Sequence, residues 1–167
     1  MNKLLLFITT ISLFGCSINP FSRNDQNYIY KSPYHYGVIN KNLLMSHDGY
    51  SWFSKQYDQY QPIEGKLRKL NFSDINIRIF MGTWCHDSKR EVPRLIKILD
   101  NLKFDHSKLV IVGLNKDKKG YFKDYTKFNI LNTPTIIFYR NDQEIGRIIE
   151  KPKDSLESDI FLIIGDK

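Results

Sequence analysis

Cysteine is scarce in this chain, which limits how the fold can be held together. The 167 residues include only two cysteines, Cys16 and Cys85, and Cys16 ends an apolar N-terminal segment. A framework of several disulfides is therefore excluded, and the fold has to rely on its hydrophobic core. With 41% hydrophobic and 26% charged residues, the composition is that of a globular domain able to form such a core.

Several sequence features that mark other protein classes are also absent. The chain has no long low-complexity tract, no internal repeat and no glycine-rich phosphate loop, which argues against repeat architectures and nucleotide-binding loops. The formal net charge is +7, but basic residues are scattered or mixed with acidic ones, as in Lys116-Asp117-Lys118-Lys119. Such runs are typical of a solvated surface, so we expect no nucleic-acid partner.

The first sixteen residues form a separate unit. A short basic start at Lys3 precedes an almost entirely apolar run over residues 4–14, which is too short for a membrane-spanning helix of about 20 residues. The run ends in Leu13-Phe14-Gly15-Cys16, which resembles the bacterial lipobox, where a small residue precedes a lipidated cysteine. We predict a lipoprotein signal peptide over residues 1–16 with lipidation at Cys16. The alternative is an ordinary secretory signal with an incidental cysteine.

Lipidation predicts a location and a redox environment. The protein would be lipid-anchored in a bacterial cell envelope, on the periplasmic side. Ser17 follows the cysteine where an aspartate would favour the inner membrane, so we expect the outer membrane. The periplasm is oxidising, and a lipidated Cys16 would leave Cys85 as a free thiol without an intramolecular partner.

The rest of the chain divides into a tether over residues 17–46 and a domain over residues 47–167, with its core at about 70–165. Apolar periodicity predicts helices from Ser51, over 63–70 after Pro62, over 88–102, over 121–128 and up to about Ile164, the last capped by Asp154 or Ser155. Short apolar runs predict strands over 77–81, 109–114, 135–139 and 144–149. This alternation predicts helices packed on a central sheet, and the closing hairpin makes the sheet mixed.

Residues 80–89, Phe-Met-Gly-Thr-Trp-Cys-His-Asp-Ser-Lys, resemble the active-site segment of the thioredoxin superfamily. Pro93 matches the proline of that family's active-site helix, and Thr133-Pro134-Thr135 resembles the segment that contains its cis-proline. The stretch from Gly82 is also similar to a bacterial subgroup with Cys-x-Asp-Ser sites. The resemblance implies a thioredoxin-like three-layer α/β fold with a central mixed sheet, to which this chain would add an N-terminal helical extension.

The resemblance implies that Cys85 is the nucleophile at the start of a helix. The thiolate is the reactive form, and the unpaired N–H groups of a helix N-terminus favour negative charge. Ser88 could direct its hydroxyl or its N–H toward the sulfur. His86, if protonated, would favour the thiolate and Asp87 would oppose it, so the sign of their combined effect stays open.

The resemblance also implies a docking edge for an extended client segment. Pro134 would lie against Cys85 in the cis form, and Thr133 would offer its backbone N–H and C=O in a short β-type pairing. Trp84 would form an apolar wall beside the sulfur.

Two departures from the family limit the chemistry. Ser88 replaces the second cysteine, and Ile79 stands where many thioredoxins have a buried aspartate that assists proton transfer. A single thiol can still perform isomerase-like or reductase-like thiol–disulfide exchange on exported client proteins that carry disulfides or oxidised thiols, if an external thiol or redox partner resolves the adduct. Whether the chain is an enzyme stays open.

Two other interpretations of the site remain. The alternative function is a redox-inactive lipoprotein that binds an extended peptide or an assembly partner in the same groove. A metal site formed by Cys85, His86, Asp87 and a distant His47 or His106 is conceivable, but adjacent residues rarely converge on one ion. We predict no cofactor.

Overall fold

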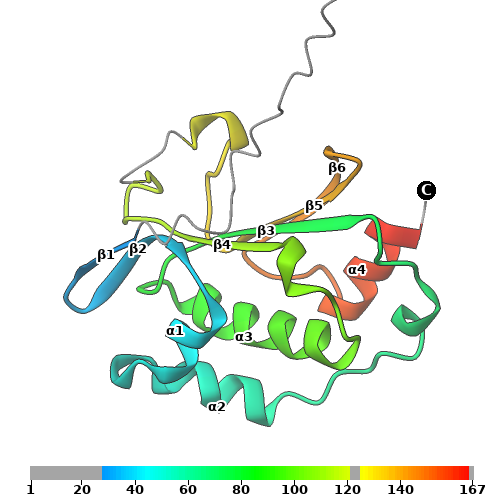
Figure 1. Ribbon diagram of the computed structural model, residues 1–167, viewed down its shortest axis with the longest axis horizontal. Helices are drawn as coiled ribbons and strands as arrows, with labels where there is room; N and C mark the ends of the chain where they lie inside the picture. Colours follow the sequence, from blue (N-terminus) through cyan, green and yellow to red (C-terminus); the bar gives the residue numbers. More distant parts are fainter. Residues whose placement is uncertain (1–27, 121–124, 166–167) are drawn as a thin grey trace, which may run out of the picture.

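The computed structural model describes residues 28–120 and 125–165. The predicted signal peptide over residues 1–16, the lipidation site Cys16 and residues 17–27 of the predicted tether lie outside the described residues. The described strands form one six-stranded sheet in the order β1-β2-β4-β3-β5-β6 (Figure 1). The strands are β1 (Tyr28–Lys31), β2 (Tyr34–Ile39), β3 (Ile75–Met81), β4 (Leu109–Gly113), β5 (Thr135–Arg140) and β6 (Gln143–Ile149).

The described α-helices lie on one side of this sheet (Figure 1). They are α1 (Lys41–Ser46), α2 (Ser51–Gln59), α3 (His86–Asn101) and α4 (Leu156–Gly165). Short 3-10 turns are η1 (Asp48–Tyr50), η2 (Leu67–Lys69), η3 (His106–Lys108) and η4 (Thr126–Phe128). Ser155 precedes α4 and its Oγ accepts a hydrogen bond from the Ser158 N–H at 3.1 Å, which is the predicted cap.

The sheet is mixed, as predicted. β3 and β4 run parallel, and the other neighbouring strands run antiparallel. The parallel pair is connected through α3, since parallel strands need a long crossover. β5 and β6 form the predicted hairpin, whose turn residues Asn141 and Asp142 have φ values of 50° and 62°. This left-handed pair suits the twist of the strands, and asparagine and aspartate adopt it without the favoured glycine.

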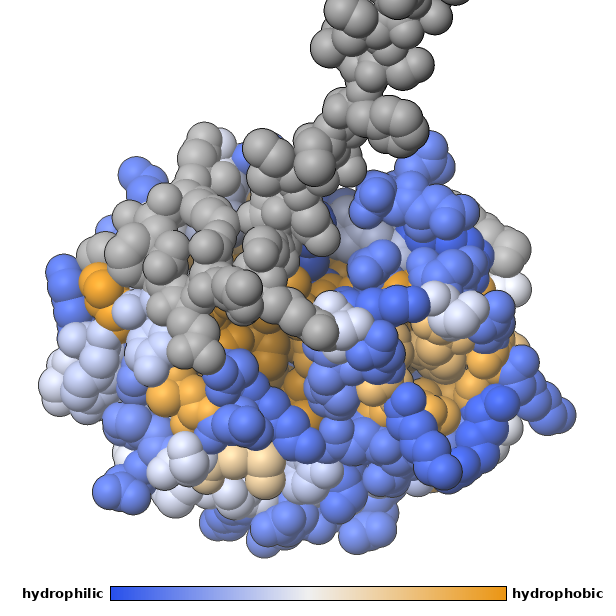
Figure 2. Space-filling view, in the orientation of Figure 1, coloured by the Kyte–Doolittle hydropathy of each residue, from blue (hydrophilic) through white to orange (hydrophobic). Residues whose placement is uncertain are grey.

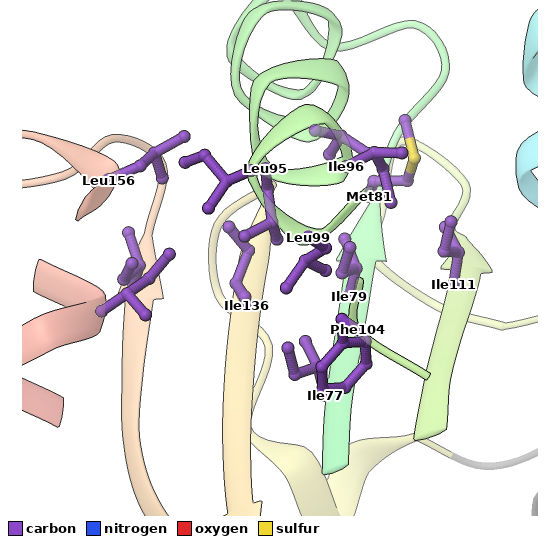
Figure 3. Packing of buried hydrophobic residues seen from close by; sticks show 14 of the residues in the cluster. Ile77, Ile79, Met81, Leu95, Ile96, Leu99, Phe104, Ile111, Ile136 and Leu156 are labelled. Carbon is purple, nitrogen blue, oxygen red and sulfur yellow. The ribbon is translucent and has the colours of Figure 1, made fainter. Parts of the chain in front are cut away.

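One face of the sheet is covered by α3 and α4, and α2 packs on the far side of α3 (Figure 1). The main core lies between α3 and the sheet, where Leu99 lies between Ile79 of β3 and Ile136 of β5 (Figure 3). These side chains are fully buried. Because α2 covers its outer side, α3 is buried along much of its length, with apolar packing on both sides.

The opposite face of the sheet holds a smaller core. Phe80 is packed by the rings of Tyr125 and Phe128, at centroid distances of 5.5 and 4.9 Å. A helix was predicted over 121–128, but the described part of this segment holds only η4, and residues 121–124 lie outside the described residues. The carbonyl of Phe128 accepts a hydrogen bond from Arg147 Nη1 at 3.0 Å, and Asn129 turns the chain at φ 50°. This long-range contact holds the segment in a shape that local periodicity does not reveal.

The N-terminal extension differs from the prediction. Residues 28–46 were assigned to the tether, but they form β1, β2 and α1, and β2 pairs with β4. The extension is therefore a hairpin followed by helices, and is not purely helical. The alternating tyrosines Tyr28, Tyr30, Tyr34 and Tyr36 have the two-residue period of strands. The Lys-Ser-Pro segment between the two pairs of tyrosines interrupts this period, so a search for apolar runs misses it.

The helix predicted over 63–70 is also wrong, since only the single turn η2 forms there. The backbone N–H of Ile63 donates to Glu157 Oε1 at 3.1 Å, and the Tyr60 hydroxyl donates to the same carboxylate at 3.0 Å. Glu157 of α4 thus holds residues 60–63, on both sides of Pro62, in an extended path.

Polar side chains cover most of the molecular face seen in Figure 2, with apolar patches between them. This agrees with a solvated charged surface. Among the described residues, no helix is both long enough and apolar enough to cross a membrane.

The close approach of β2 to the end of β4 generates a first prediction. A Cβ on Gly113 would lie 2.7 Å from the backbone oxygen of His35, so Gly113→Ala should lower the free energy of unfolding by about 1–3 kcal/mol. Gly65→Ala is the control, because a Cβ there meets nothing within 4 Å. Urea denaturation measures both variants. Equal stability of the two variants would contradict the packing of β2 against Gly113.

Burial of His35 in β2 generates a second prediction. Burial lowers the pKa of His35 below its ordinary value of 6.5, and the neighbouring His47 lowers it further. Below pH 6.5 the unfolded chain therefore binds a proton that the folded chain does not bind, so the free energy of unfolding should fall as the pH falls toward the lowered pKa. Urea midpoints between pH 5 and pH 8 should show this slope, and it should be reduced in His35→Asn. Parallel profiles for the two proteins would refute it.

Candidate functional site

Cys85 lies at the N-terminus of α3 as its N-cap residue, with φ −83° and ψ 130°. Its N–H donates to the Gly82 carbonyl at 2.9 Å, and its own carbonyl accepts from the Lys89 N–H at 3.0 Å. The loop over residues 82–85 therefore closes a tight turn directly before the helix. Cys85 is a free, partly exposed thiol, and it stands beside the open first turn of α3.

The Thr133–Pro134 segment, directly before β5, contacts this thiol. The Thr133–Pro134 peptide bond is cis, and Cys85 Sγ donates a hydrogen bond to the Thr133 carbonyl at 3.0 Å. The Pro134 carbonyl instead accepts from the Glu150 N–H at 2.8 Å. The structure thus brings Cys85, Thr133 and Pro134 together, and it leaves the carbonyl next to the sulfur outside the sheet ladder. Leu131, two residues before Thr133, is 69% exposed.

Ser88 points inward from the first turn of α3. It is fully buried, and its Oγ accepts a hydrogen bond from the Gly82 N–H at 3.3 Å. Among the described residues, the Ser88 hydroxyl is bonded to Gly82 and not to the sulfur of Cys85. Ser88 therefore fixes the loop that leads to Cys85.

Trp84 is fixed by a hydrogen bond at its polar edge. Its Nε1 donates to the Leu114 carbonyl at 2.9 Å, at the end of β4. The indole lies so close to Gly82 that a Cβ there would be 2.4 Å from Trp84 Cε2. Glycine is thus required at position 82 for the ring to adopt this place. Trp84 is half-buried, which leaves part of the indole at the surface.

A charged cluster surrounds the start of α3. Asp87 Oδ1 lies 2.7 Å from Arg90 Nη2, and Arg90 also pairs with the buried Glu91. The hydrogen bond that Arg90 donates to Glu91 and the negative charge of both carboxylates raise the pKa of Arg90. The His86 side chain is 87% exposed and lies 3.8 Å from Asp87. Arg90 was missed in the sequence, although its three-residue spacing from Asp87 is typical of a helical ion pair.

The histidines considered as metal ligands lie elsewhere. His47 packs on the Tyr50 ring at 4.6 Å, and His106 pairs with Asp100 at 2.7 Å. Residues 28–120 and 125–165 include no group of three or more His, Cys, Asp or Glu side chains that could hold a metal ion.

Comparison with known proteins points to the thioredoxins. No family model matches the chain. It is 29% identical to Thioredoxin H9 of Arabidopsis thaliana over 101 residues, which is 60% of this chain and 62% of that protein. It is 30% identical to the TPR repeat-containing thioredoxin TDX of the same plant over 88 residues, or 53% of this chain and 22% of that protein. The chain spans less than two thirds of either relative.

Two solved thioredoxin structures are similar to part of this chain. Among solved structures, mitochondrial thioredoxin 3 of Saccharomyces cerevisiae covers 60% of this chain and 84% of its own at a TM-score of 0.38 and 22% identity. The germline thioredoxin Deadhead of Drosophila covers 46% of this chain and 70% of its own at a TM-score of 0.35 and 22% identity. The plant relatives do not bear on the predicted bacterial lipid anchor.

The inward position of Ser88 generates a third prediction. Ser88→Ala removes the acceptor for the buried Gly82 N–H, and should lower the free energy of unfolding by about 1–3 kcal/mol. Ser46→Ala, at an exposed position in α1, should change it by no more than about 0.5 kcal/mol. Urea denaturation compares the two. An unchanged Ser88→Ala variant would show that the hydroxyl does not hold the loop.

Proposed function

We propose that this thioredoxin-like protein performs monothiol thiol–disulfide exchange on exported proteins. The observation that carries the proposal is the placement of a single, partly exposed thiol at the start of α3, 3.0 Å from the Thr133 carbonyl. Sequence similarity to two thioredoxins supports thiol or redox chemistry as the general class.

The reaction begins with loss of the Cys85 proton. The thiol donates that proton to the Thr133 carbonyl, whereas attack on a disulfide requires the thiolate. The thiolate forms a new S–S bond with one client sulfur, the client S–S bond breaks, and the second client sulfur leaves as a thiolate. No net oxidation or reduction occurs in this step.

Departure of the proton also frees the docking edge. Once Sγ no longer donates, the Thr133 carbonyl can accept a hydrogen bond from a client backbone N–H in a β-type pairing. The exposed part of Trp84 and the exposed Leu131 supply apolar surface near this edge. An extended client segment is therefore the form of substrate that the site would accept.

Resolution of the adduct requires a thiol from outside the chain. Ser88 is buried, it accepts a hydrogen bond from Gly82, and its hydroxyl is a poor nucleophile at neutral pH. A second client thiolate that attacks the client sulfur of the mixed disulfide releases Cys85 and leaves a rearranged client disulfide. If an external thiolate attacks the Cys85 sulfur instead, the client leaves with both sulfurs reduced and Cys85 is joined to the external thiol. A second external thiolate, or the second thiol of a redox partner, then attacks the external sulfur, frees Cys85 and leaves as the oxidised disulfide.

The contact between Cys85 and Thr133 also supports a second candidate. The Thr133 carbonyl already has a partner in the Cys85 thiol, so the same edge can bind an extended peptide or an assembly partner without any thiol chemistry. In that case partner binding depends on the Thr133 edge and does not require the Cys85 sulfur.

For location we propose lipidation at Cys16 and anchoring in a bacterial cell envelope, on the periplasmic side of the outer membrane. This rests on the lipobox-like sequence alone. Cys16→Ser should release the full chain from the membrane fraction, and tight membrane association of that variant would refute the anchor.

A further prediction tests exchange directly. Cells that make the protein should contain mixed disulfides, seen as high-mass bands that disappear on reduction and are absent in Cys85→Ala. Ser88→Cys adds a potential resolving thiol to the first turn of α3, and should reduce the amount of trapped adduct. Trapping by acid quench and mass spectrometry would identify the attached client.

The two candidates differ in their outcomes. Loss of partners in Cys85→Ala supports exchange. Retention of the same partners in Cys85→Ala, together with no adduct in the wild type, would refute exchange and favour the binding function.

A further inference from the structure

A buried polar cluster connects the N-terminal extension to the loop that carries Cys85. Its centre is Tyr50 of η1, which is 2% exposed. The Tyr50 hydroxyl accepts a hydrogen bond from the His35 N–H at 3.0 Å and lies 2.8 Å from His35 Nδ1. The hydroxyl is therefore fixed against β2 from two directions. Burial of such a group is costly unless its hydrogen bonds are satisfied.

The same hydroxyl faces Thr83, two residues before Cys85. Burial raises the pKa of Tyr50, and the Thr83 side chain acts in the opposite direction through its contact with the hydroxyl. Thr83 is 1% exposed, and its Oγ1 is fully buried without a hydrogen-bond partner of ordinary geometry among the described residues. Tyr50 is thus the polar group toward which this buried hydroxyl can turn.

We propose that Tyr50 is a positioning residue for the loop that carries Cys85, and that the protonation of His35 sets the direction of its hydrogen bonds. The inference deepens the proposed function and rests on it for the role of Cys85. The position of the loop is measurable whether or not the thiol reacts.

The protons in this cluster permit two arrangements. When His35 Nδ1 carries no proton, the Tyr50 O–H donates to it, and the Thr83 hydroxyl can donate to the Tyr50 oxygen. When Nδ1 is protonated, it donates to the Tyr50 oxygen instead, and the Tyr50 proton turns toward Thr83. The Thr83 oxygen then accepts a hydrogen bond from the Tyr50 O–H, and the Thr83 hydroxyl hydrogen has to point away from Tyr50. Thr83 therefore donates to Tyr50 in one state and accepts from it in the other.

The titratable groups around His35 come from three segments. Tyr28 and Tyr30 of β1 lie at ring-centroid distances of 5.5 and 4.6 Å, His47 lies at 4.9 Å and Tyr50 at 5.5 Å. Burial lowers the pKa of His35, and the charge of His47 lowers it further. Among these rings, Tyr50 is the one whose hydroxyl lies within hydrogen-bond distance of His35 Nδ1.

The extension also fixes this cluster close to the end of β4. A Cβ on Gly113 would lie 2.7 Å from the His35 oxygen, and the Leu114 carbonyl, one residue further, holds the Trp84 indole. The loop is therefore held on one side through Leu114 and on the other through Thr83. A shift at Thr83 reaches Cys85 through Trp84, the residue between them.

The test compares Tyr50→Phe with Tyr57→Phe in the full chain. Both variants lose one hydroxyl and keep the ring, but the Tyr57 hydroxyl bonds Asp100, which is remote in sequence from the loop. Two quantities are followed from pH 5.5 to pH 8.5: the amide chemical shifts of Thr83 and Cys85, and the rate of Cys85 alkylation by iodoacetamide. His35→Asn supplies a variant that keeps a polar group beside Tyr50 and does not titrate in this range.

In the wild type, the amides of Thr83 and Cys85 should titrate together with the His35 ring. This titration should vanish in Tyr50→Phe and in His35→Asn, and should persist in Tyr57→Phe. The alkylation rate at pH 7 should change by about twofold to tenfold in Tyr50→Phe and stay at the wild-type value in Tyr57→Phe. Thr83→Val should reproduce the Tyr50→Phe profile, and the double variant should add nothing further.

Equal profiles for Tyr50→Phe and the wild type would overturn the inference and leave Tyr50 with a packing role alone. If the amides respond as expected while no mixed disulfide forms in cells, the proposed exchange function fails and the positioning role of Tyr50 stands.

Discussion

The hydrogen bond between Cys85 Sγ and the Thr133 carbonyl exists only because one strand places two distant segments side by side. β3 ends at Met81 and leads directly into the loop before α3, and its residue Phe80 pairs with Thr135 of β5. That pairing sets the cis Thr133–Pro134 bond opposite the start of α3. A shift of one residue in this register would reverse the faces of β5 and move the carbonyl away from the sulfur. The chemistry of the site therefore depends on the burial that fixes β3 between β4 and β5.

Much of this arrangement could be predicted because its signals are local. The apolar runs of β3 to β6 and the spacing of α3 identify the mixed sheet, and the hairpin at Asn141 and Asp142 follows from turn chemistry. The errors occur where a distant side chain controls the backbone. Glu157 holds the chain extended after Pro62, and Arg147 captures the Phe128 carbonyl, and neither effect leaves a periodic pattern. The hairpin of β1 and β2 was missed because its strands are short and mix aromatic with polar residues.

At the site, the sequence identifies which residues gather but not how their polar atoms are used. Cys85 and Thr133 come together beside Pro134, yet the hydrogen bonds from Gly82 to Ser88 and from Trp84 to Leu114 depend on the three-dimensional path of the loop. Both contacts stabilise the loop itself. The contribution of the N-terminal extension was likewise hidden, since Tyr50 and Thr83 are separated by the whole of α2 and β3 in sequence.

The burial of α3 between the sheet and α2 has a consequence for how the thiol meets another molecule. Amides of a helix covered on both sides exchange with solvent only when much of the domain opens, so the backbone behind Cys85 should be among the last to exchange. The Cys85 sulfur is therefore attached to a rigid helix. A binding partner has to adapt its own conformation to the site, so most of the conformational entropy lost on binding is lost by the partner.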